Sequence, residues 1–311
     1  MGIRVTEPVG RPDVRPLPTV KGTSSGTGPD DGAYAHTSAR TEHPATGRKP
    51  SMPITRTCVL AGFTAAVSTA TLTLPAHADT PAPHERAATR CTYPSEVLDL
   101  TNWKLTLPTG EEEDPAEITQ PELATFSADP WFRAEDSCDA VGFRAAVNGV
   151  TTSGSSYPRA ELREMTDDGE DEAAWSTTDG THTLVVREAF TALPEDRPYL
   201  VGAQVHGGDD DVTVFRLEGS SLYITDGDDR HHHLVTDDYE LGTEFEAKFV
   251  ARDGEIDAYY NGRLQTTISH DGDTNYFKAG AYTQANCDNS EPCADDNYGE
   301  VRISRIKVTH S

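Results

Sequence analysis

The segment FVARDGEIDAYYNGRLQTTI, residues 249–268, decides the fold class of this chain. It contains the dipeptides Asp-Gly (253–254) and Asn-Gly (261–262), which favour the two-residue turns of β-hairpins. Short runs rich in apolar and aromatic residues flank both turns. The segment therefore predicts two successive hairpins. The same pattern of short runs and turn residues recurs from about residue 91 to the C-terminus.

The other expected strands fill most of the remaining chain after residue 91. They lie at residues 102–108, 142–150, 157–165, 181–193, 199–207, 212–226, 244–268, 276–284 and 299–310. Prolines interrupt residues 111–136, where we expect a loop with one short helix. Many short strands at regular spacing, without an internal repeat, predict an all-β fold, a sandwich or jelly roll of two antiparallel sheets.

The N-terminal part predicts export. Residues 1–51 are rich in Pro, Gly, Ser and Thr and show no period of 2 or 3.6, so we expect disorder or a non-native upstream extension. Residues 52–78 have a basic start, an apolar run and an Ala-x-Ala end, the layout of a secretory signal peptide. A membrane anchor is the alternative, although the run is short for a span of about 20 apolar residues. We expect a linker at 79–90 and a folded, secreted domain at 91–311.

Charge limits the classes of partner. The chain has a net charge of −26, and residues 1–78 hold eight Lys or Arg and five Asp or Glu. Residues 79–311 therefore hold 18 basic and 47 acidic residues, a net charge of −29. So acidic a surface argues against nucleic acid or an anionic membrane as a partner. It also makes any cluster of basic residues more informative.

Four cysteines remain after removal of the expected signal peptide: Cys91, Cys138, Cys287 and Cys293. An even number in an exported chain indicates two disulfides, and three pairings are possible. We favour Cys287–Cys293, which closes a short loop, together with Cys91–Cys138. A structural zinc site is the alternative, but the chain has no Cys-x-x-Cys pair.

Three expected strands place unusual polar residues on one face, because alternate side chains of a strand share a face. The faces carry Tyr157, Arg159, Glu161, Arg163 and Met165; Gln204 and His206; and Tyr276, Lys278, Gly280, Tyr282 and Gln284. Each strand alone has an ordinary explanation, such as a ladder of ion pairs along Arg159, Glu161 and Arg163. Together, the three faces predict the floor of a groove for a polyanion, in which arginines bind carboxylates.

These residue types suit β-elimination at a uronic acid. The reaction removes the C5 proton next to a carboxylate and expels the O4-linked sugar. Arg and Gln can neutralise the carboxylate, His or Tyr can take the proton, and Tyr can protonate the leaving oxygen. No metal or cofactor is needed in principle.

The same three stretches resemble motifs of the alginate lyases of polysaccharide lyase family 7. RAELR (159–163) is similar to the family motif R-[S/T/A]-E-L-R, QVH (204–206) to Q-[I/V]-H, and YFKAGAYTQ (276–284) to Y-F-K-A-G-x-Y-x-Q. LTNWKLTLP (100–108) and ISRIKVTH (303–310) add flanking similarity. The resemblance spans residues 91–311 and implies a catalytic β-jelly roll with a deep substrate groove on one face.

The resemblance implies roles for individual residues. Arg159, Gln204 and His206 would neutralise the substrate carboxylate, His206 would be the base for guluronate, and Tyr282 would be the acid and, for mannuronate, also the base. Glu161 would orient the arginines, and Arg163, Lys278 and Gln284 would line the groove. We therefore expect a secreted, endo-acting alginate lyase without a metal or cofactor, and by default a monomer. Val205 in the second motif favours polymannuronate.

Two other functions stay open at this point. One is a lyase for another polyuronate such as glucuronan, and the other is a non-catalytic polyuronate-binding module. Other acidic or histidine-rich stretches receive less weight. We expect His231–His233 to splay apart before a strand rather than to bind a metal, and residues 209–211 to form a solvated turn. Glu255 and Asp257 resemble the paired carboxylates of glycoside hydrolases, but no third acidic residue follows in register.

Overall fold

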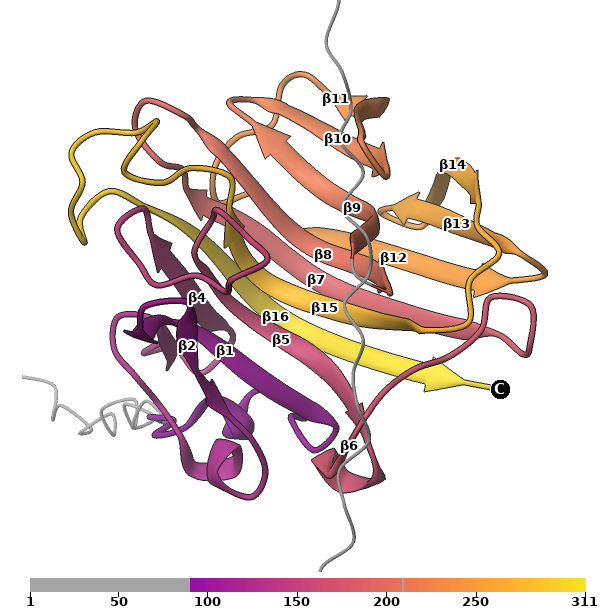
Figure 1. Cartoon of the computed structure of the whole chain (residues 1–311), viewed down its shortest axis with the longest axis horizontal. Helices are drawn as coiled ribbons and strands as arrows, with labels where there is room; N and C mark the ends of the chain where they lie inside the picture. The colour runs from indigo at the N-terminus through magenta and orange to yellow at the C-terminus, as the bar shows by residue number, and fades with distance from the viewer. Residues whose placement is uncertain (1–89, 209) are drawn as a thin grey trace, which may run out of the picture. The chain divides into compact units, whose positions relative to one another are not determined.

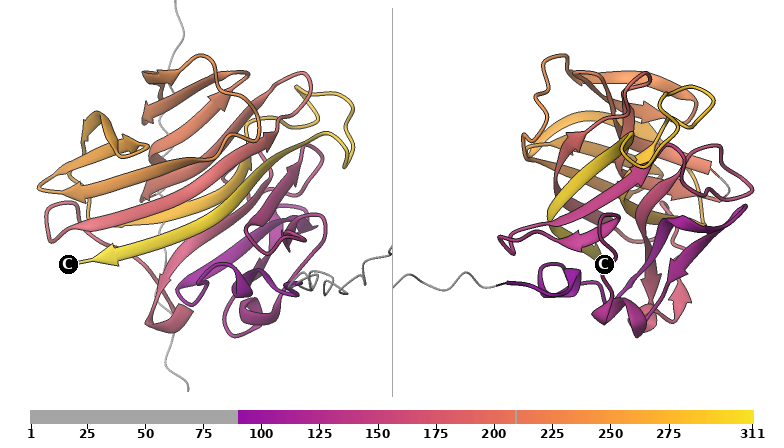
Figure 2. Two further views of the ribbon diagram at one scale, coloured as in Figure 1. Left: turned by 180° about the vertical axis from the view of Figure 1, so that it is seen from behind. Right: turned by 90° about the vertical axis from the view of Figure 1, so that its left-hand side faces the viewer.

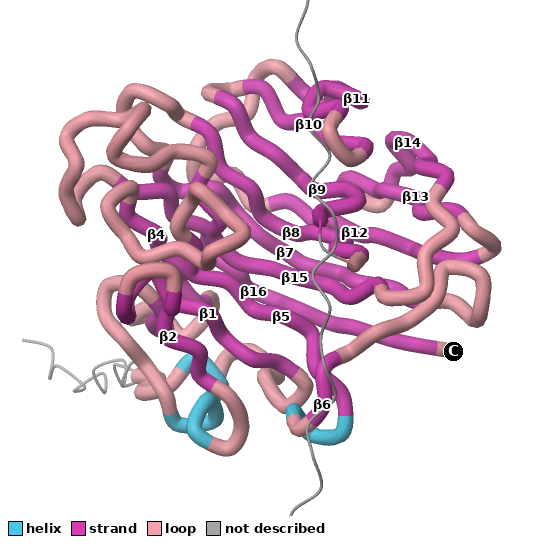
Figure 3. Tube along the Cα trace, viewed as in Figure 1, coloured by secondary structure: helices cyan, strands magenta, loops and turns pink. Residues whose placement is uncertain are grey.

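The computed structural model describes residues 90–208 and 210–311. The regular elements of this part of the chain are almost all β-strands, arranged in two antiparallel sheets and joined by loops (Figures 1 and 3). The all-β prediction is therefore confirmed. The expected extension, signal peptide and nearly all of the expected linker lie outside the described residues and stay predictions.

The first sheet has nine strands. In spatial order they are β11 (Asp229–Thr236), β10 (Ser221–Asp226), β9 (Asp210–Glu218), β8 (Tyr199–Gly207), β15 (Asn275–Thr283), β5 (Arg159–Thr166), β1 (Trp103–Glu111) and β2 (Asp114–Ile118), and the short β6 (Asp171–Glu172) pairs with β5. We call it the groove sheet, because both cavities described below open on it.

The second sheet has seven strands and faces the viewer in the left panel of Figure 2. In spatial order they are β14 (Arg263–Ser269), β13 (Glu255–Tyr260), β12 (Phe245–Arg252), β7 (His182–Ala192), β16 (Tyr298–His310), β4 (Val141–Ala146) and β3 (Phe132–Ala134). Three short 3₁₀ helices complete the described elements: η1 (Pro94–Glu96), η2 (Glu122–Thr125) and η3 (Asp167–Gly169).

The two predicted hairpins are confirmed as β12–β13–β14, paired antiparallel. Asp253 and Gly254 have φ values of 53° and 75°, and Asn261 and Gly262 have values of 49° and 75°. Positive φ at both central residues is the geometry of a type I′ turn, which matches the twist of the flanking strands. Asp-Gly and Asn-Gly tolerate this geometry, which explains why they mark both turns.

Two local expectations were wrong. Residues 111–136 do contain a short helix, η2, but they also contain β2 and β3. Pro115 lies in β2, an edge strand, where a missing N–H is tolerated, so the proline did not prevent pairing. The second correction concerns His231–His233, which lie inside β11 rather than before it.

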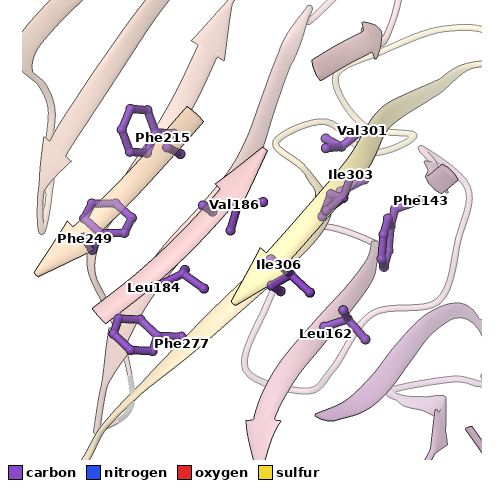
Figure 4. Close-up of a cluster of buried hydrophobic side chains, with 14 of the residues drawn as sticks. Phe143, Leu162, Leu184, Val186, Phe215, Phe249, Phe277, Val301, Ile303 and Ile306 are labelled. Carbon is purple, nitrogen blue, oxygen red and sulfur yellow. The ribbon is translucent and has the colours of Figure 1, made fainter. Parts of the chain in front are cut away.

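The hydrophobic core fills the space between the sheets (Figure 4). Leu162 and Phe277 reach it from the groove sheet and meet Leu184 and Phe143 of the other sheet, and all four side chains are fully buried. Ala160, next to Leu162 in the face pattern, is also fully buried. The face of β5 that the sequence predicted to pack into the sandwich, with Ala160 and Leu162, is therefore part of the core.

Both favoured disulfides are present. Cys91 pairs with Cys138, and Cys287 pairs with Cys293. The first joins the start of the described chain to the turn before β4, and the second closes the loop between β15 and β16. Within the described ranges, no helix is long and apolar enough to cross a membrane.

Candidate active site

The three polar-faced strands are neighbours in the groove sheet, in the order β8–β15–β5. Lys278 of β15 lies opposite Arg163 on one side and Gln204 on the other. Tyr282 lies opposite Arg159, and Tyr276 lies opposite His206. Strand order and register therefore bring the residues of the three sequence motifs into one cluster.

A bulge in β15 shapes this cluster. Between Lys278 and Tyr282 the pairing with β8 shifts, so that β15 has one residue more than β8. Gly280 lies in this bulge with φ of 148°, and a Cβ there would clash with the backbone of Ala160. The motif therefore needs glycine at this position, since it alone permits the close approach of β15 to β5.

Glu161 is at the centre of the cluster, and its side chain is fully buried. Its Oε1 accepts a hydrogen bond from the side-chain amide of Gln204. Its Oε2 lies 2.6 Å from Nζ of Lys278 and 3.7 Å from a guanidinium nitrogen of Arg159. A buried carboxylate is stable only when it is paired, and here a cation and an amide pair it.

Arg163 is held by different groups. A guanidinium nitrogen lies 3.1 Å from Oε2 of Glu172, and another donates to the backbone carbonyl of Glu164 at 2.8 Å. The guanidinium carbon lies 3.9 Å above the ring of Tyr276, which stacks on His206 with centroids 4.9 Å apart. Tyr276 was predicted on the groove face but was given no role, and Glu172 was not predicted in the site. The position of Tyr276 on the same strand face as Lys278 and Tyr282 could have identified it as a site residue.

His206 is mostly removed from water, and its environment disfavours the charged form. Burial and, to a smaller extent, the nearby Lys278 lower the pKa of His206 to about 4, although Glu161 opposes this shift. Nδ1 is buried and has no hydrogen-bond partner among the described residues. The imidazole is therefore neutral at pH 7. Burial also lowers the pKa of Lys278, which Glu161 opposes.

Tyr282 presents its ring to a cation and its hydroxyl to a loop. The guanidinium carbon of Arg159 lies 4.2 Å from the ring centroid. The hydroxyl lies 3.0 Å from Oγ of Ser155, in the loop before β5. The ring of Tyr157 meets Tyr282 edge-on, with centroids 6.5 Å apart. Ser155 was missed from the sequence, because no strand period applies to a loop.

Two adjoining cavities open on this part of the groove sheet. One of about 250 Å³ is lined by Thr152, Gly154, Ser155, Arg159, Gln204, His206, Asp210, Asp211, Tyr276, Lys278 and Tyr282. The other, of about 180 Å³, is lined by Tyr157, Val201, Gln204, Asp210, Asp211, Val214, Arg216, Thr225, Gly227, Asp228, Arg230, Tyr282 and Gln284. Four shared lining residues make the two cavities continuous.

Of the predicted site residues, Glu161 and Arg163 do not line either cavity. Glu161 lies beneath the floor, where it binds Gln204 and Lys278. Gln284 lines the smaller cavity and accepts a hydrogen bond of 2.7 Å from Arg216. The geometry therefore separates groups that can touch a substrate from groups that hold them.

Residues 210 and 211 contribute acid groups to both cavities, although the sequence suggested a solvated turn. Asp210 begins β9, and the side chain of Asp211 is only partly exposed. Burial and the neighbouring Asp210 together raise the pKa of Asp211 to about 6. This carboxyl therefore titrates between pH 5 and 7.

The histidine triplet of β11 has three separate partners. His231 lies 2.9 Å from Glu218, His232 bonds to Thr266, and His233 bonds to Gln265. Across residues 90–208 and 210–311, no group of three or more His, Cys, Asp or Glu side chains is arranged to hold a metal ion.

Comparisons with known proteins identify the family of the chain. The family model described as alginate lyase matches residues 98–310. The crystal structure of the alginate lyase from Corynebacterium sp. is 65% identical, with a TM-score of 0.71, and the match covers 72% of this chain and 100% of that one. Alginate lyase AlgAT5 from polysaccharide lyase family 7 is 50% identical over 70% of this chain and 99% of its own, with a TM-score of 0.67.

A more distant structure has the same fold. Alginate lyase A1-II′, a member of polysaccharide lyase family 7, is 26% identical over 70% of this chain and 98% of its own, with a TM-score of 0.59. A search of curated proteins found no match. The family model covers residues 98–310, and two of these structures are 65% and 50% identical. The chain therefore belongs to the alginate lyases of polysaccharide lyase family 7.

Proposed function

We propose that this enzyme cleaves the 4-O-glycosidic bond of alginate by β-elimination, acts within the polymer and leaves an unsaturated uronate end. One observation carries the proposal. Arg159, Gln204, His206 and Tyr282, which supply every group that the reaction needs, line the same cavity of about 250 Å³.

Arg159 and Gln204 neutralise the carboxylate of the sugar whose C5 proton is removed. Arginine is always charged in proteins, and its planar fork suits a carboxylate. The contacting charged groups Arg159, Lys278 and Glu161 sum to +1 while His206 is neutral. Asp210 and Asp211 line the same cavity, so this positive charge is local to the floor around Arg159, where it supports contact with a uronate carboxylate.

His206 acts as a neutral group. With its pKa lowered to about 4, the imidazole has a free lone pair at pH 7 and can accept the C5 proton of a guluronate. In this protein the positive charge that meets the carboxylate comes from Arg159, and His206 can only add a hydrogen bond. The lowered pKa therefore argues against a positively charged His206.

Tyr282 protonates the leaving oxygen and, for mannuronate, also takes the C5 proton. The C5–H bond breaks, a double bond forms between C4 and C5, and the bond from C4 to O4 breaks with its electrons going to the oxygen. The tyrosine proton then goes to that oxygen. The guanidinium carbon of Arg159 lies 4.2 Å from the ring centroid, so a cation packs on the ring whose hydroxyl exchanges the proton.

Incubation with alginate tests the reaction. Wild-type enzyme should produce the ultraviolet absorbance of an unsaturated uronate without added metal, and Tyr282→Phe should abolish it while polymer binding remains. Tyr259→Phe is the matched control, because it removes a hydroxyl from β13 in the other sheet, which lines neither cavity. No absorbance with alginate, polymannuronate or polyguluronate would refute the proposal, and large early products would establish endo action.

Two rival functions make different predictions in the same assay. A lyase for another polyuronate would release unsaturated ends from glucuronan and not from alginate. A binding module would retain the polymer and release none. Val205 between Gln204 and His206 leads us to expect faster cleavage of polymannuronate than of polyguluronate, which the two block polymers would test directly.

We also propose that the enzyme is secreted as a monomer. The two disulfides support an oxidising location, and the substrate is a polymer outside the cell. Residues 52–78 would direct export. Fusion of this segment to a reporter should export the reporter, and light scattering of the mature chain should give the mass of one copy.

A further inference from the structure

Ser155 contacts the hydroxyl of Tyr282. The loop that carries it comes just before β5, and Ser155 lines the same cavity as Tyr282. Its Oγ lies 3.0 Å from the Tyr282 hydroxyl, and either atom can donate in this contact. The direction of this one hydrogen bond therefore depends on which of the two oxygens holds a proton to give.

The other contacts of Ser155 Oγ determine what it can do. It accepts a hydrogen bond from the backbone N–H of Tyr157 at 3.2 Å. Its own proton can point to the Tyr157 carbonyl at 3.3 Å or to the Tyr282 hydroxyl at 3.0 Å. One proton thus has two acceptors, and the shorter distance is the one to Tyr282.

The ionisation state of Tyr282 determines which of the two acceptors the Ser155 proton points to. A neutral tyrosine can donate to Ser155, whose proton then points to the Tyr157 carbonyl. An ionised tyrosine can only accept, so the serine proton turns toward it, and a hydrogen bond to a charged oxygen is about twice as strong as a neutral one. Ser155 keeps its proton throughout, and only the direction of the bond reverses.

The loop holds Ser155 in place from both ends. Thr151 Oγ1 donates to the backbone carbonyls of Ser155 and Tyr157 at 3.2 and 2.8 Å. The side-chain amide of Asn286 donates to the Ser156 carbonyl at 3.0 Å, next to the disulfide at Cys287. Oγ is therefore fixed toward Tyr282 before a substrate arrives, which avoids an ordering cost during the reaction.

We propose that Ser155 is a positioning residue that stabilises ionised Tyr282, and that it works together with the cation of Arg159 over the ring. This inference rests on the proposed role of Tyr282 in proton transfer. Ser155 does not exchange a proton with the substrate. It lowers the free energy of the state in which Tyr282 has given its proton to the leaving oxygen, or is ready to accept one.

The first test is kinetic. Ser155→Ala should lower kcat by about tenfold or more and leave KM nearly unchanged, as expected for loss of one charge-assisted hydrogen bond in the transition state. The pH limb that depends on Tyr282 should move to higher pH. Ser155→Thr keeps the hydroxyl and should restore both properties. Ser156→Ala is the matched control, because this neighbouring side chain is exposed.

The second test does not depend on catalysis. Tyrosine labelled with ¹³C at Cζ gives a ring signal for Tyr282 that can be assigned by its loss in Tyr282→Phe. Its ionisation midpoint should lie at higher pH in Ser155→Ala than in wild type. If the alanine variant does not fold, Ser155→Cys replaces the hydroxyl by a weaker donor and should shift the midpoint in the same direction.

The two tests separate failure of this inference from failure of the proposed function. An unchanged midpoint of Tyr282 in the Ser155 variants would overturn the inference, even in an active lyase. So would a change confined to KM, which would indicate that Ser155 only shapes the cavity. A shifted midpoint in a protein that releases no unsaturated ends would support the contact between the two residues and refute the lyase assignment.

Discussion

Replacing Glu188 by glutamine should make the folded protein more stable at pH 8 and leave it nearly unchanged at pH 4.5. Glu188 belongs to β7 and points between the sheets, where it is completely buried. Its Oε1 accepts a hydrogen bond of 3.4 Å from the backbone N–H of Ala203, and Oε2 has no hydrogen-bond partner among the described residues. A buried carboxyl with so little support is held in its neutral form.

The magnitude follows from the pKa. Burial raises the pKa of Glu188 from 4.5 to about 8, and the Ala203 N–H offsets only part of this. Between these values the unfolded chain releases the proton and the folded chain keeps it, so the free energy of unfolding falls as pH rises. The slope is about 1.4 kcal/mol per pH unit, which gives a loss of about 5 kcal/mol across the interval. Glutamine cannot ionise and removes this loss.

Urea unfolding at pH 4.5, 6, 7 and 8 measures the effect. The difference in free energy of unfolding between Glu188→Gln and wild type should grow with pH, and other titrating groups cancel in this difference. Glu240→Gln, at an exposed position, is the control and should show no such trend. A difference that stays constant from pH 4.5 to 8 would refute the reasoning, because Glu188 would then ionise alike in both states.

Three further changes have predictable results. Gly280→Ala should lower the free energy of unfolding by at least about 2 kcal/mol, measured with denaturant, since the bulge leaves no room for a Cβ. Replacement of both Cys91 and Cys138 by serine opens a 47-residue loop and should cost about 4 kcal/mol in the same measurement, and an unchanged midpoint would contradict this. Glu161→Gln should reduce kcat/KM by about a hundredfold or more, because it leaves Lys278 buried without its counter-charge.

The period of 2 in the sequence predicted much of the site. It assigned Ala160 to packing and Arg159 to the opposite side, and both assignments agree with the burial of β5. The same period would have identified Glu188, because it lies on the inner face of β7 together with Leu184 and Val186. A glutamate is unusual in a core, because burying its charge is costly. The raised pKa keeps Glu188 neutral, which makes a core position possible.

The contacts between strands could not be predicted in the same way. Pairing of β15 with both β5 and β8 joins residues at least 68 positions apart, as for Asn275 and Gly207, and no local pattern encodes that order. The sequence therefore suggested that Glu161 holds two arginines. In the fold it holds Gln204 and Lys278 most closely, while Arg163 pairs with Glu172 of the two-residue strand β6. A strand so short has no period from which its side chains could be placed.

The charge of the protein and the charge of the site act over different distances. Residues 79–311 have a net charge of −29, which repels a polyanion. Salt screens exposed charges beyond about 8 Å at physiological ionic strength, so this repulsion is weak outside the first layers of solvent. The excess positive charge of Arg159 and Lys278 over Glu161 lies in a mostly buried cluster, where screening is much less effective. An acidic protein can therefore bind an acidic polymer, provided that each carboxylate reaches the cavity floor, and recognition depends on contact rather than on long-range attraction.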